Sequence, residues 1–304
     1  MDNRLLLKDM RLFSMVARAA SFAAVARKEG MSPAFVSKRI AVLEQALKIR
    51  LFHRTTRSVS LTQDGEATLR HVQKILADVD QMSDSMAHDQ AVPSGLLRIS
   101  SSAGFGRNQL APALSELARL YPLLHLQLEL LDRPVDLIGE GFDLDIRVGG
   151  SHEPSLIALH LARNYRVLCA SPDYLAKHGT PQRLEDLAHH RCIVTRERDQ
   201  SFGLWRLSGP NGIETIKVPT PLSSNNGEIV HQWGVEGHGI FLRAIWDVGA
   251  DLRKGLLIRL LPDYSQDADV AAIYPHRLEQ SNRLRACVRF LKSWFASHAP
   301  DGYG

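Results

Sequence analysis

Small hydroxyl and basic side chains share one face of a helix that the sequence predicts over residues 33–47. Ser32 can cap this helix, and Pro33 suits its first position because proline has no N–H to leave unsatisfied. At about 100° per residue, apolar side chains gather on one side, at Val36, Ile40, Leu43 and Leu47. The opposite side carries Ala34, Ser37, Lys38, Ala41, Gln45 and Lys48. This small, basic face suits a helix that enters a groove of a polyanion, and the alternative is an ordinary solvated helix.

Shorter elements on either side must position that face. Residues 5–18 have helical periodicity, and a second helix is expected between Ser21, a capping residue, and Gly30, which suits a left-handed stop. Two helices joined by a glycine-containing turn are a candidate helix-turn-helix. The alternating pattern of residues 51–62 predicts a small β-wing with Arg54 and Arg57 at its tip.

A longer helix is expected after Thr62, with Asp64 and Glu66 in its first turn, where acids favour the helix dipole. Its apolar stripe comprises Leu69, Val72, Leu76, Val79, Met82 and Met86. Because no neighbouring segment is available to cover this stripe, we expect pairing with the same helix of a second subunit. Packing on the body of its own chain is the alternative.

The charge distribution favours a polyanion partner for the N-terminal part alone. The 304 residues carry a formal net charge of +4, but residues 1–60 hold 12 Lys and Arg against 4 Asp and Glu. The first residues do not form a secretory leader, and no run is long enough to span a bilayer. Cys169, Cys192 and Cys287 form no C-x-x-C pair, which argues against disulfides or zinc and favours the cytoplasm.

Beyond a hinge at residues 91–95, strand and helix patterns alternate and predict an α/β body with a mostly parallel sheet. Strands are expected at 96–102, 124–132 and 144–149, and helices at 108–121 and 135–141. Residues 165–264 repeat the theme. We expect the last helix, from residue 282, to pack on the first half of the body.

The first 65 residues resemble those of the LysR-type transcriptional regulators. The resemblance is carried by Ser37, Ile40, Leu43–Glu44, Leu51–Phe52, Arg54, and Leu61–Thr62 before Gly65, and in the body by "FDLDIRVG" and "VEGHGIFLR". It implies an all-α winged helix-turn-helix over 1–61 and a long linker and dimerisation helix over 62–90. It also implies an α/β effector-binding domain over 91–304 that resembles a two-lobed type II periplasmic binding protein. Lobe I would span about 95–163 and 267–304, and lobe II about 164–266. Such proteins usually act as tetramers on promoter DNA.

The resemblance also implies a set of DNA contacts. Many members have Gln and then Pro after the serine that opens the third helix, where this chain has Pro33 and Ala34. We expect these two residues to touch thymine methyl groups, and Arg39 to reach a phosphate. The full predicted set is Ser32, Pro33, Ala34, Ser37, Lys38, Arg39, Arg54, Thr55 and Arg57.

A narrower resemblance indicates what the body binds. "SAGFGRNQLAPAL", "VTRERD" and "LSSNNGEIVHQWGVEGHGIFLRAIWDV" are similar to the subgroup that regulates tartrate and malate utilisation. We expect a hydroxy-dicarboxylate in the crevice between the lobes, held by strand-end hydroxyls, helix N-termini and a guanidinium from Arg243 or Arg107. The predicted set is Ser100, Ser101, Ser102, Phe105, Arg107, Arg147, Thr195, Asn225, Asn226 and Arg243. The serines alternatively only cap the following helix, and Arg147 is alternatively structural.

Other functions remain to be weighed against a regulator. A different small carboxylate or an aromatic acid is an alternative effector, and an architectural DNA-binding protein would need none. An enzyme is disfavoured because the chain lacks G-x-S-x-G, H-E-x-x-H and G-x-x-x-x-G-K-[ST]. A solute-binding protein would require export. We therefore expect a nucleoid-associated cytoplasmic regulator with no cofactor and no metal.

Overall fold

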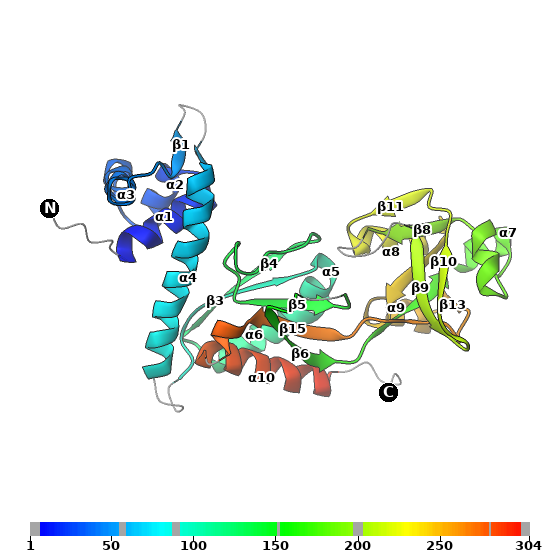
Figure 1. Ribbon diagram of the computed structural model, residues 1–304. Coiled ribbons are helices and arrows are strands. Elements are labelled where there is room, and N and C mark those ends of the chain that lie inside the picture. The colour runs from blue at the N-terminus through cyan, green and yellow to red at the C-terminus, as the bar shows by residue number, and fades with distance from the viewer. Residues whose placement is uncertain are drawn as a thin grey trace. The chain divides into compact units, whose positions relative to one another are not determined.

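The computed structural model describes residues 7–54, 59–86, 92–150, 153–196, 203–279 and 281–298 (Figure 1). Only the backbone is described at residues 54, 77, 80–86 and 277. Contacts divide the chain into two units. We call residues 1–90 with 138–141 the head, and residues 91–137 with 142–304 the body. Over the described part of the chain, none of the helices has the length and apolar character needed to cross a membrane.

Three helices of the head confirm the predicted helix-turn-helix. They are α1 (Leu7–Ala19), α2 (Phe22–Lys28) and α3 (Pro33–Leu47). The Ser21 hydroxyl accepts a hydrogen bond from the Ala24 N–H, and the Ser32 hydroxyl accepts one from the Phe35 N–H, each at 3.2 Å. Both serines therefore act as N-caps, and Gly30 makes the turn between α2 and α3 with a φ of +64°.

The wing is the antiparallel pair of β1 (Phe52–Arg54) and β2 (Val59–Leu61). Glu44 of α3 anchors it, because its Oε1 accepts a hydrogen bond from the Leu51 N–H at 2.9 Å. Next comes α4 (Gln63–Met86), whose start is capped by the Thr62 hydroxyl, which accepts from the Gly65 N–H at 2.9 Å. The predicted wing and long helix are thus both present.

The expectation that no neighbouring segment covers the α4 stripe is wrong for its first half. Val72 is only 3% exposed, and Leu69 and Leu76 pack with it against the core of the head. That core is built from the apolar faces of α1, α2 and α3, so α4 completes it. The side chains of Met82 and Met86, farther along the stripe, lie outside the described residues.

The body begins with a sheet that we call lobe I. Its strands are β3 (Gly95–Ser101), β4 (Leu124–Leu130), β5 (Leu144–Val148), β6 (Leu156–Ala162) and β15 (Val270–Pro275), in the order β4-β3-β5-β15-β6. The helices α6 (Ala111–Leu120) and α10 (Asn282–Ser297) pack against each other and against this sheet. The last helix therefore joins the core of the first half of the body, with Leu284, Cys287 and Leu291 fully buried.

The second sheet, lobe II, is covered on both faces. Its strands are β7 (Tyr165–Ala170), β8 (Cys192–Thr195), β11 (Leu222–Ser224), β12 (Ile240–Ala244) and β13 (Ile258–Leu260), in the order β11-β8-β12-β7-β13, with β14 (Gln266–Asp267) also on β7. Alternate residues of β7 face α8 (Gly227–Val235) and α9 (Ile245–Arg253) on one side. The others face α7 (Pro172–His178), the 3₁₀ helix η2 (Leu184–His189) and the hairpin β9 (Leu204–Gly209)–β10 (Gly212–Lys217). This explains why residues 167–170 of β7 are all apolar.

The sheets are mixed, which corrects the expectation of a mostly parallel sheet. β3 is parallel to β4 and β5, and β8 is parallel to β11 and β12, whereas β7 and β15 are antiparallel to every partner. The physical reason is the path of the chain, which enters lobe II between β6 and β7 and returns between β14 and β15. The two segments that connect the lobes are hydrogen-bonded to each other, because Asn164 Nδ2 in the first donates to the Ala268 carbonyl in the second at 2.8 Å.

Two expected helix positions are wrong. Residues 137–141 form turns rather than a helix, since Pro134 precedes the segment and Gly141, at a φ of +68°, ends it. The helix expected from residue 108 begins earlier, as α5 (Ala103–Phe105) and the π-turn η1 (Gly106–Leu110) leading into α6. Gly106 permits this start, because a Cβ there would lie 2.2 Å from Leu130 Cδ2.

Candidate functional site

The first candidate site is the exposed face of α3. Val36, Ile40 and Leu43 are buried in the head, so the opposite face is turned to solvent. On it, Ser32, Pro33, Ala34 and Lys38 are exposed and Ser37 is half-buried. Ser32 already accepts the capping bond from Phe35, which leaves its hydroxyl proton available to an outside acceptor.

Arg39 forms an ion pair with Asp9 inside the head, whereas the sequence predicted that it reaches a phosphate. Its Nε donates to Asp9 Oδ1 at 2.6 Å, and its Nη2 donates to Asp9 Oδ2. Asp9 is only 2% exposed, so this bidentate pair neutralises a buried carboxylate and ties α3 to α1. The helical wheel alone did not reveal the pairing, because Asp9 lies thirty residues away in the sequence.

Of the three DNA contacts predicted in the wing, the structure describes only the backbone of Arg54. Arg54 lies in β1, where its backbone pairs with Val59, and its side chain is outside the described residues. The predicted contacts Thr55 and Arg57 also lie outside them.

Sequence reasoning passed over two apolar side chains on the solvent side of α3. Phe35 is 43% exposed and Val42 39%. Their spacing of seven residues places them on the same edge of the helix, a signal already present in the sequence. Apolar surface of this kind suits the methyl group of thymine in the major groove of DNA.

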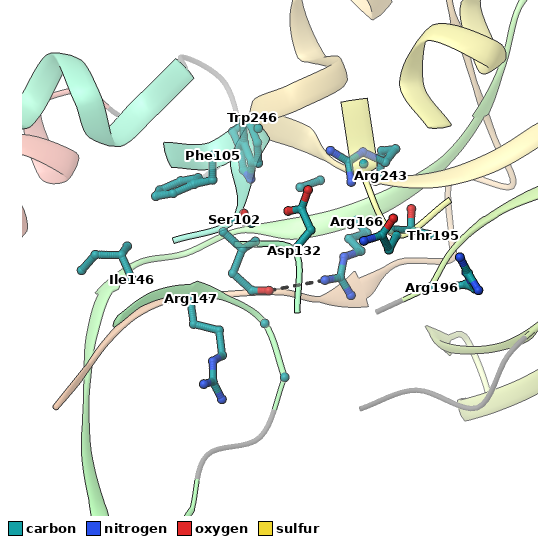
Figure 2. A pocket seen from close by; sticks show the side chains of 17 residues that line it. Ser102, Phe105, Asp132, Ile146, Arg147, Arg166, Thr195, Arg196, Arg243 and Trp246 are labelled. Carbon is teal, nitrogen blue, oxygen red and sulfur yellow. Dashed lines mark hydrogen bonds between the residues drawn. The ribbon is translucent and has the colours of Figure 1, made fainter. Parts of the chain in front are cut away.

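The second candidate site is a cavity of about 110 Å³ in the body, lined from both lobes. Figure 2 shows its labelled side chains, with Phe105 and Trp246 close to each other and the hydrogen bond from Arg166 to the Val148 carbonyl as a dashed line. Lobe I contributes the segment after β3, Asp132 and the end of β5. Lobe II contributes β7, the end of β8, the start of α8 and the end of β12. Strand ends and helix starts thus converge on it, as expected for a ligand crevice of an α/β fold.

Six of the predicted effector contacts line this cavity. They are Ser102, Phe105, Arg147, Thr195, Asn225 and Arg243. Ser100 and Ser101 do not, and their hydroxyls are buried in lobe I, where they donate to Asp145 Oδ1 at 2.8 Å and to the Ile146 carbonyl at 2.9 Å. Both are fully covered by the sheet, so a direct role in binding is not supported for them.

The other two predicted contacts bridge the lobes instead of lining the cavity. Arg107 pairs with Glu228 of α8. Asn226 caps α8 through its Oδ1, which accepts from the Glu228 N–H at 3.0 Å, and its Nδ2 donates to Asp132 Oδ2 at 2.7 Å. The aromatic pair of Phe105 and Trp246, with ring centroids 5.1 Å apart, is a further contact across the lobes.

Several arginine guanidinium groups line the cavity and give its wall positive charge. Arg243 donates from Nε to Asp247 Oδ2 at 2.7 Å, and its guanidinium lies so near Gly227 that a Cβ there would be 2.1 Å from Nη1. Burial works against the charge on Asp247, but Arg243 and His231 hold the pKa of this carboxyl below its usual range. Arg166, which sequence reasoning missed, is buried and donates to Gln266 Oε1 and to the Val148 carbonyl. Arg147 donates to Asp145 at 3.0 Å from Nη2.

Two buried polar atoms of the cavity wall have no hydrogen-bond partner among the described residues. They are the Thr195 hydroxyl oxygen and the Trp246 indole Nε1. Because leaving a buried polar group unsatisfied costs about 1–3 kcal/mol, a ligand that supplies partners here is favoured. Thr195 was predicted, whereas Trp246 and Asp132 had no distinguishing signal in the sequence. Over the whole described part of the chain, no group of three or more His, Cys, Asp or Glu side chains is placed so that it could hold a metal ion.

Comparison with known proteins identifies the families that the two parts of the chain match. Residues 7–66 match the family described as "Bacterial regulatory helix-turn-helix protein, lysR family", and residues 90–296 match "LysR substrate binding domain". The chain is 53% identical to the HTH-type transcriptional regulator DmlR of Escherichia coli strain K12 over 301 residues, covering 99% of this chain and 98% of that protein. It is 43% identical to the HTH-type transcriptional activator TtdR of the same strain over 289 residues, or 95% and 93% of the two chains.

Solved structures give the same picture of the fold. CrgA, a LysR-type transcriptional regulator from Neisseria meningitidis, matches with a TM-score of 0.60 and 30% identity, covering 95% of this chain and 99% of that one. The full-length Vibrio cholerae virulence activator AphB matches with a TM-score of 0.62 and 26% identity over the same shares.

Proposed function

This chain belongs to the LysR family of bacterial transcriptional regulators, and from that premise we propose that it binds promoter DNA through α3 and a hydroxy-dicarboxylate in the lobe cavity. The family and the two-lobed α/β fold indicated by the sequence are thereby confirmed. Its relatives DmlR and TtdR are named as a transcriptional regulator and a transcriptional activator, which supports a regulatory role rather than an enzymatic one. The effector, the promoter contacts and the assembly are our proposals.

The proposed DNA-reading surface consists of Ser32, Pro33, Ala34, Ser37 and Lys38 of α3. The contacts predicted from the sequence at Arg54, Thr55 and Arg57 are proposed to add to it. Its support is the exposed face of α3, where short side chains let the helix backbone approach base edges. Arg39 is left out, since Asp9 engages it. Lys38 is the exposed cation nearest the middle of this face.

Replacement of Lys38 with alanine is expected to weaken operator binding by about 1–3 kcal/mol. The loss arises because a base-edge donor is removed while the buried face of α3 is untouched. Titration by gel shift, on operator and on scrambled duplex, measures it. Lys28→Ala removes an equal charge from the exposed end of α2 and controls for general electrostatics. An equal loss on both duplexes for Lys38→Ala would instead assign this lysine to the DNA backbone.

The proposed effector site is the cavity between the lobes, and one observation carries the proposal. Guanidinium groups of Arg243 and Arg166 and the unsatisfied polar atoms of Thr195 and Trp246 line a single small cavity. Guanidinium is the side chain best suited to a carboxylate, while a hydroxyl and an indole N–H suit the hydroxyl and second carboxylate of a small acid. This combination, together with the resemblance to tartrate and malate regulators, favours a hydroxy-dicarboxylate.

Calorimetric titration of the full chain with malate and tartrate stereoisomers tests this proposal. We expect saturable binding of at least one of them and none of succinate at the same concentration, because succinate lacks the hydroxyl. Benzoate serves as the aromatic-acid alternative. Binding of benzoate alone would overturn the choice of effector, and silence toward every acid would favour an architectural DNA binder.

We further propose a homodimer through α4 and a tetramer of two such dimers in the cytoplasm, associated with the nucleoid. The stripe of α4 supports it, since among its described side chains Leu69, Val72 and Leu76, all in the first half of the helix, pack against the core of the head. Ile75 remains 40% exposed on the same helix. Effector binding would then shift the population between two tetramer shapes and alter DNA between the heads.

A further inference from the structure

A chain of four charged groups runs from the cavity wall into lobe II. Arg243 of β12 donates to Asp247 of α9 from Nε at 2.7 Å. The other carboxylate oxygen of Asp247 lies 3.3 Å from Nδ1 of His231 on α8. On its far side, His231 Nε2 lies 2.8 Å from Asp251 Oδ2, also on α9. His231 is therefore held between two carboxylates, one of which it shares with an arginine of the effector site.

The geometry identifies the protonation state that this arrangement needs. A neutral imidazole has one N–H and one lone pair, so it would have to turn its lone pair toward a carboxylate oxygen. Only the imidazolium donates from both ring nitrogens, and both nitrogens here face carboxylates. Burial favours the neutral ring, but hydrogen bonds and charges of Asp247 and Asp251 raise the pKa of His231 above its ordinary value of 6.5.

We infer that His231 is a positioning residue that makes the affinity of the cavity for a carboxylate effector depend on pH. This inference rests on the proposed function, because it requires an anionic ligand. With His231 protonated, two cations and two anions cancel, and Asp247 divides its charge between Arg243 and His231. Loss of the proton leaves the four groups with a net charge of minus one and Asp247 pairing with Arg243 alone. An incoming carboxylate then meets a weaker positive potential.

Among the residues that the structure describes, the other groups around His231 do not supply a competing titration in this range. Phe241 of β12 stacks against its ring, with centroids 6.2 Å apart. Cys169 of β7 lies near the same cluster, and burial raises the pKa of its thiol so that it stays neutral. On α8 itself, Glu228 is paired with Arg107. The ionisation that falls above pH 6.5 at this site is therefore that of His231.

The sign of the effect follows from linkage. Because the neighbouring carboxylates raise the pKa of His231, the high-affinity state persists above pH 6.5 and is lost as the pH rises through the raised value. By reciprocity, a carboxylate that binds better to the protonated state raises the pKa of His231 further, so binding takes up protons. Malate and tartrate are fully ionised above about pH 6, so their own titration does not contribute.

The test is calorimetry of the full chain with malate and tartrate between about pH 6 and about pH 9, in buffers of different ionisation enthalpy. We expect wild-type affinity to fall about three- to tenfold across this range with net proton uptake on binding. His231→Gln keeps a neutral donor but cannot titrate, so its affinity should be flat and equal to the high-pH value of the wild type. Asp251→Asn should move the fall to lower pH, a change that a purely structural role would not produce.

A matched control is His238→Gln. His238 pairs with Glu236 on the surface of the same lobe, outside the cavity, so this variant should retain the wild-type pH profile. Binding with a pH-independent affinity in the wild type, or the same pH profile in His231→Gln, would overturn the inference while leaving the proposed effector intact. Absence of binding by either acid at every pH would overturn the proposed function and this inference together.

Discussion

Replacing Arg39 with alanine is expected to destabilise the head by about 3 kcal/mol, at the lower end of the cost of breaking a buried ion pair. The carboxylate of Asp9 is buried and receives both Nε and Nη2 of Arg39. Without the guanidinium it would be left as an uncompensated charge between α1 and α3. The loss lies at the lower end because Arg39 itself keeps partial contact with solvent.

The measurement must report on the head itself. All four tryptophans, Trp205, Trp233, Trp246 and Trp294, belong to the body, so tryptophan fluorescence would not follow the unfolding of α1 and α3. Amide hydrogen exchange of the full chain, read by mass spectrometry over residues 7–47, resolves the head from the body.

Two variants control this experiment. The double variant Asp9→Leu/Arg39→Met is expected to regain most of the lost protection, because removing both charges is far less costly than removing one. Arg27→Ala, at an exposed position on α2, should change stability by no more than about 0.5 kcal/mol. Unchanged exchange in Arg39→Ala combined with weaker DNA binding would show instead that Arg39 contacts phosphate.

Replacing Arg243 with glutamine is expected to reduce the affinity for a hydroxy-dicarboxylate by about 10- to 100-fold. This range corresponds to the loss of a hydrogen bond between charged groups, about 1.5–3 kcal/mol. Arg243 lines the cavity, whereas Arg107, the other arginine singled out from the sequence, lies outside it and pairs with Glu228. Arg107→Gln should therefore change affinity only a few-fold, through the contact between the lobes. Calorimetry on both variants makes the comparison.

Stability must be separated from binding in this case, because Arg243→Gln leaves Asp247 with His231 as its cationic partner. The double variant Arg243→Gln/Asp247→Asn removes the unbalanced charge and is expected to restore the melting temperature without restoring affinity. Should the double variant bind the acid as tightly as the wild type, Arg243 would not be the carboxylate ligand.

Local signals predicted the elements of the head well. Ser21, Ser32 and Thr62 each cap the helix that follows them, because capping depends on a residue's own nearest neighbours. The same local reasoning failed at 135–141, where an apolar pattern of seven residues is too short to hold a helix against two glycines. It also failed on strand direction, which depends on where the chain crosses between lobes.

The candidate sites divide in the same way. The exposed face of α3 could be drawn from periodicity, since burial of Val36, Ile40 and Leu43 decides what their helix turns to solvent. Among the serines at 100–102, the sequence offered three equivalent hydroxyls, and the sheet covers two and leaves Ser102 at the cavity. Nothing local distinguished Arg166 or Trp246 from other arginines and tryptophans.

By itself the sequence determined which segments form the head, which face of α3 is exposed, and the family to which the chain belongs, because these follow from short-range periodicity, capping and motif spacing. Only the tertiary structure decided which charges are already paired. Asp9 pairs with Arg39, which lies thirty residues away in the sequence. Asp247 pairs with both Arg243 and His231, and His231 lies sixteen residues from it in the sequence. Electrostatic partners are chosen by proximity in space, and proximity arises only when the sheets and helices have packed.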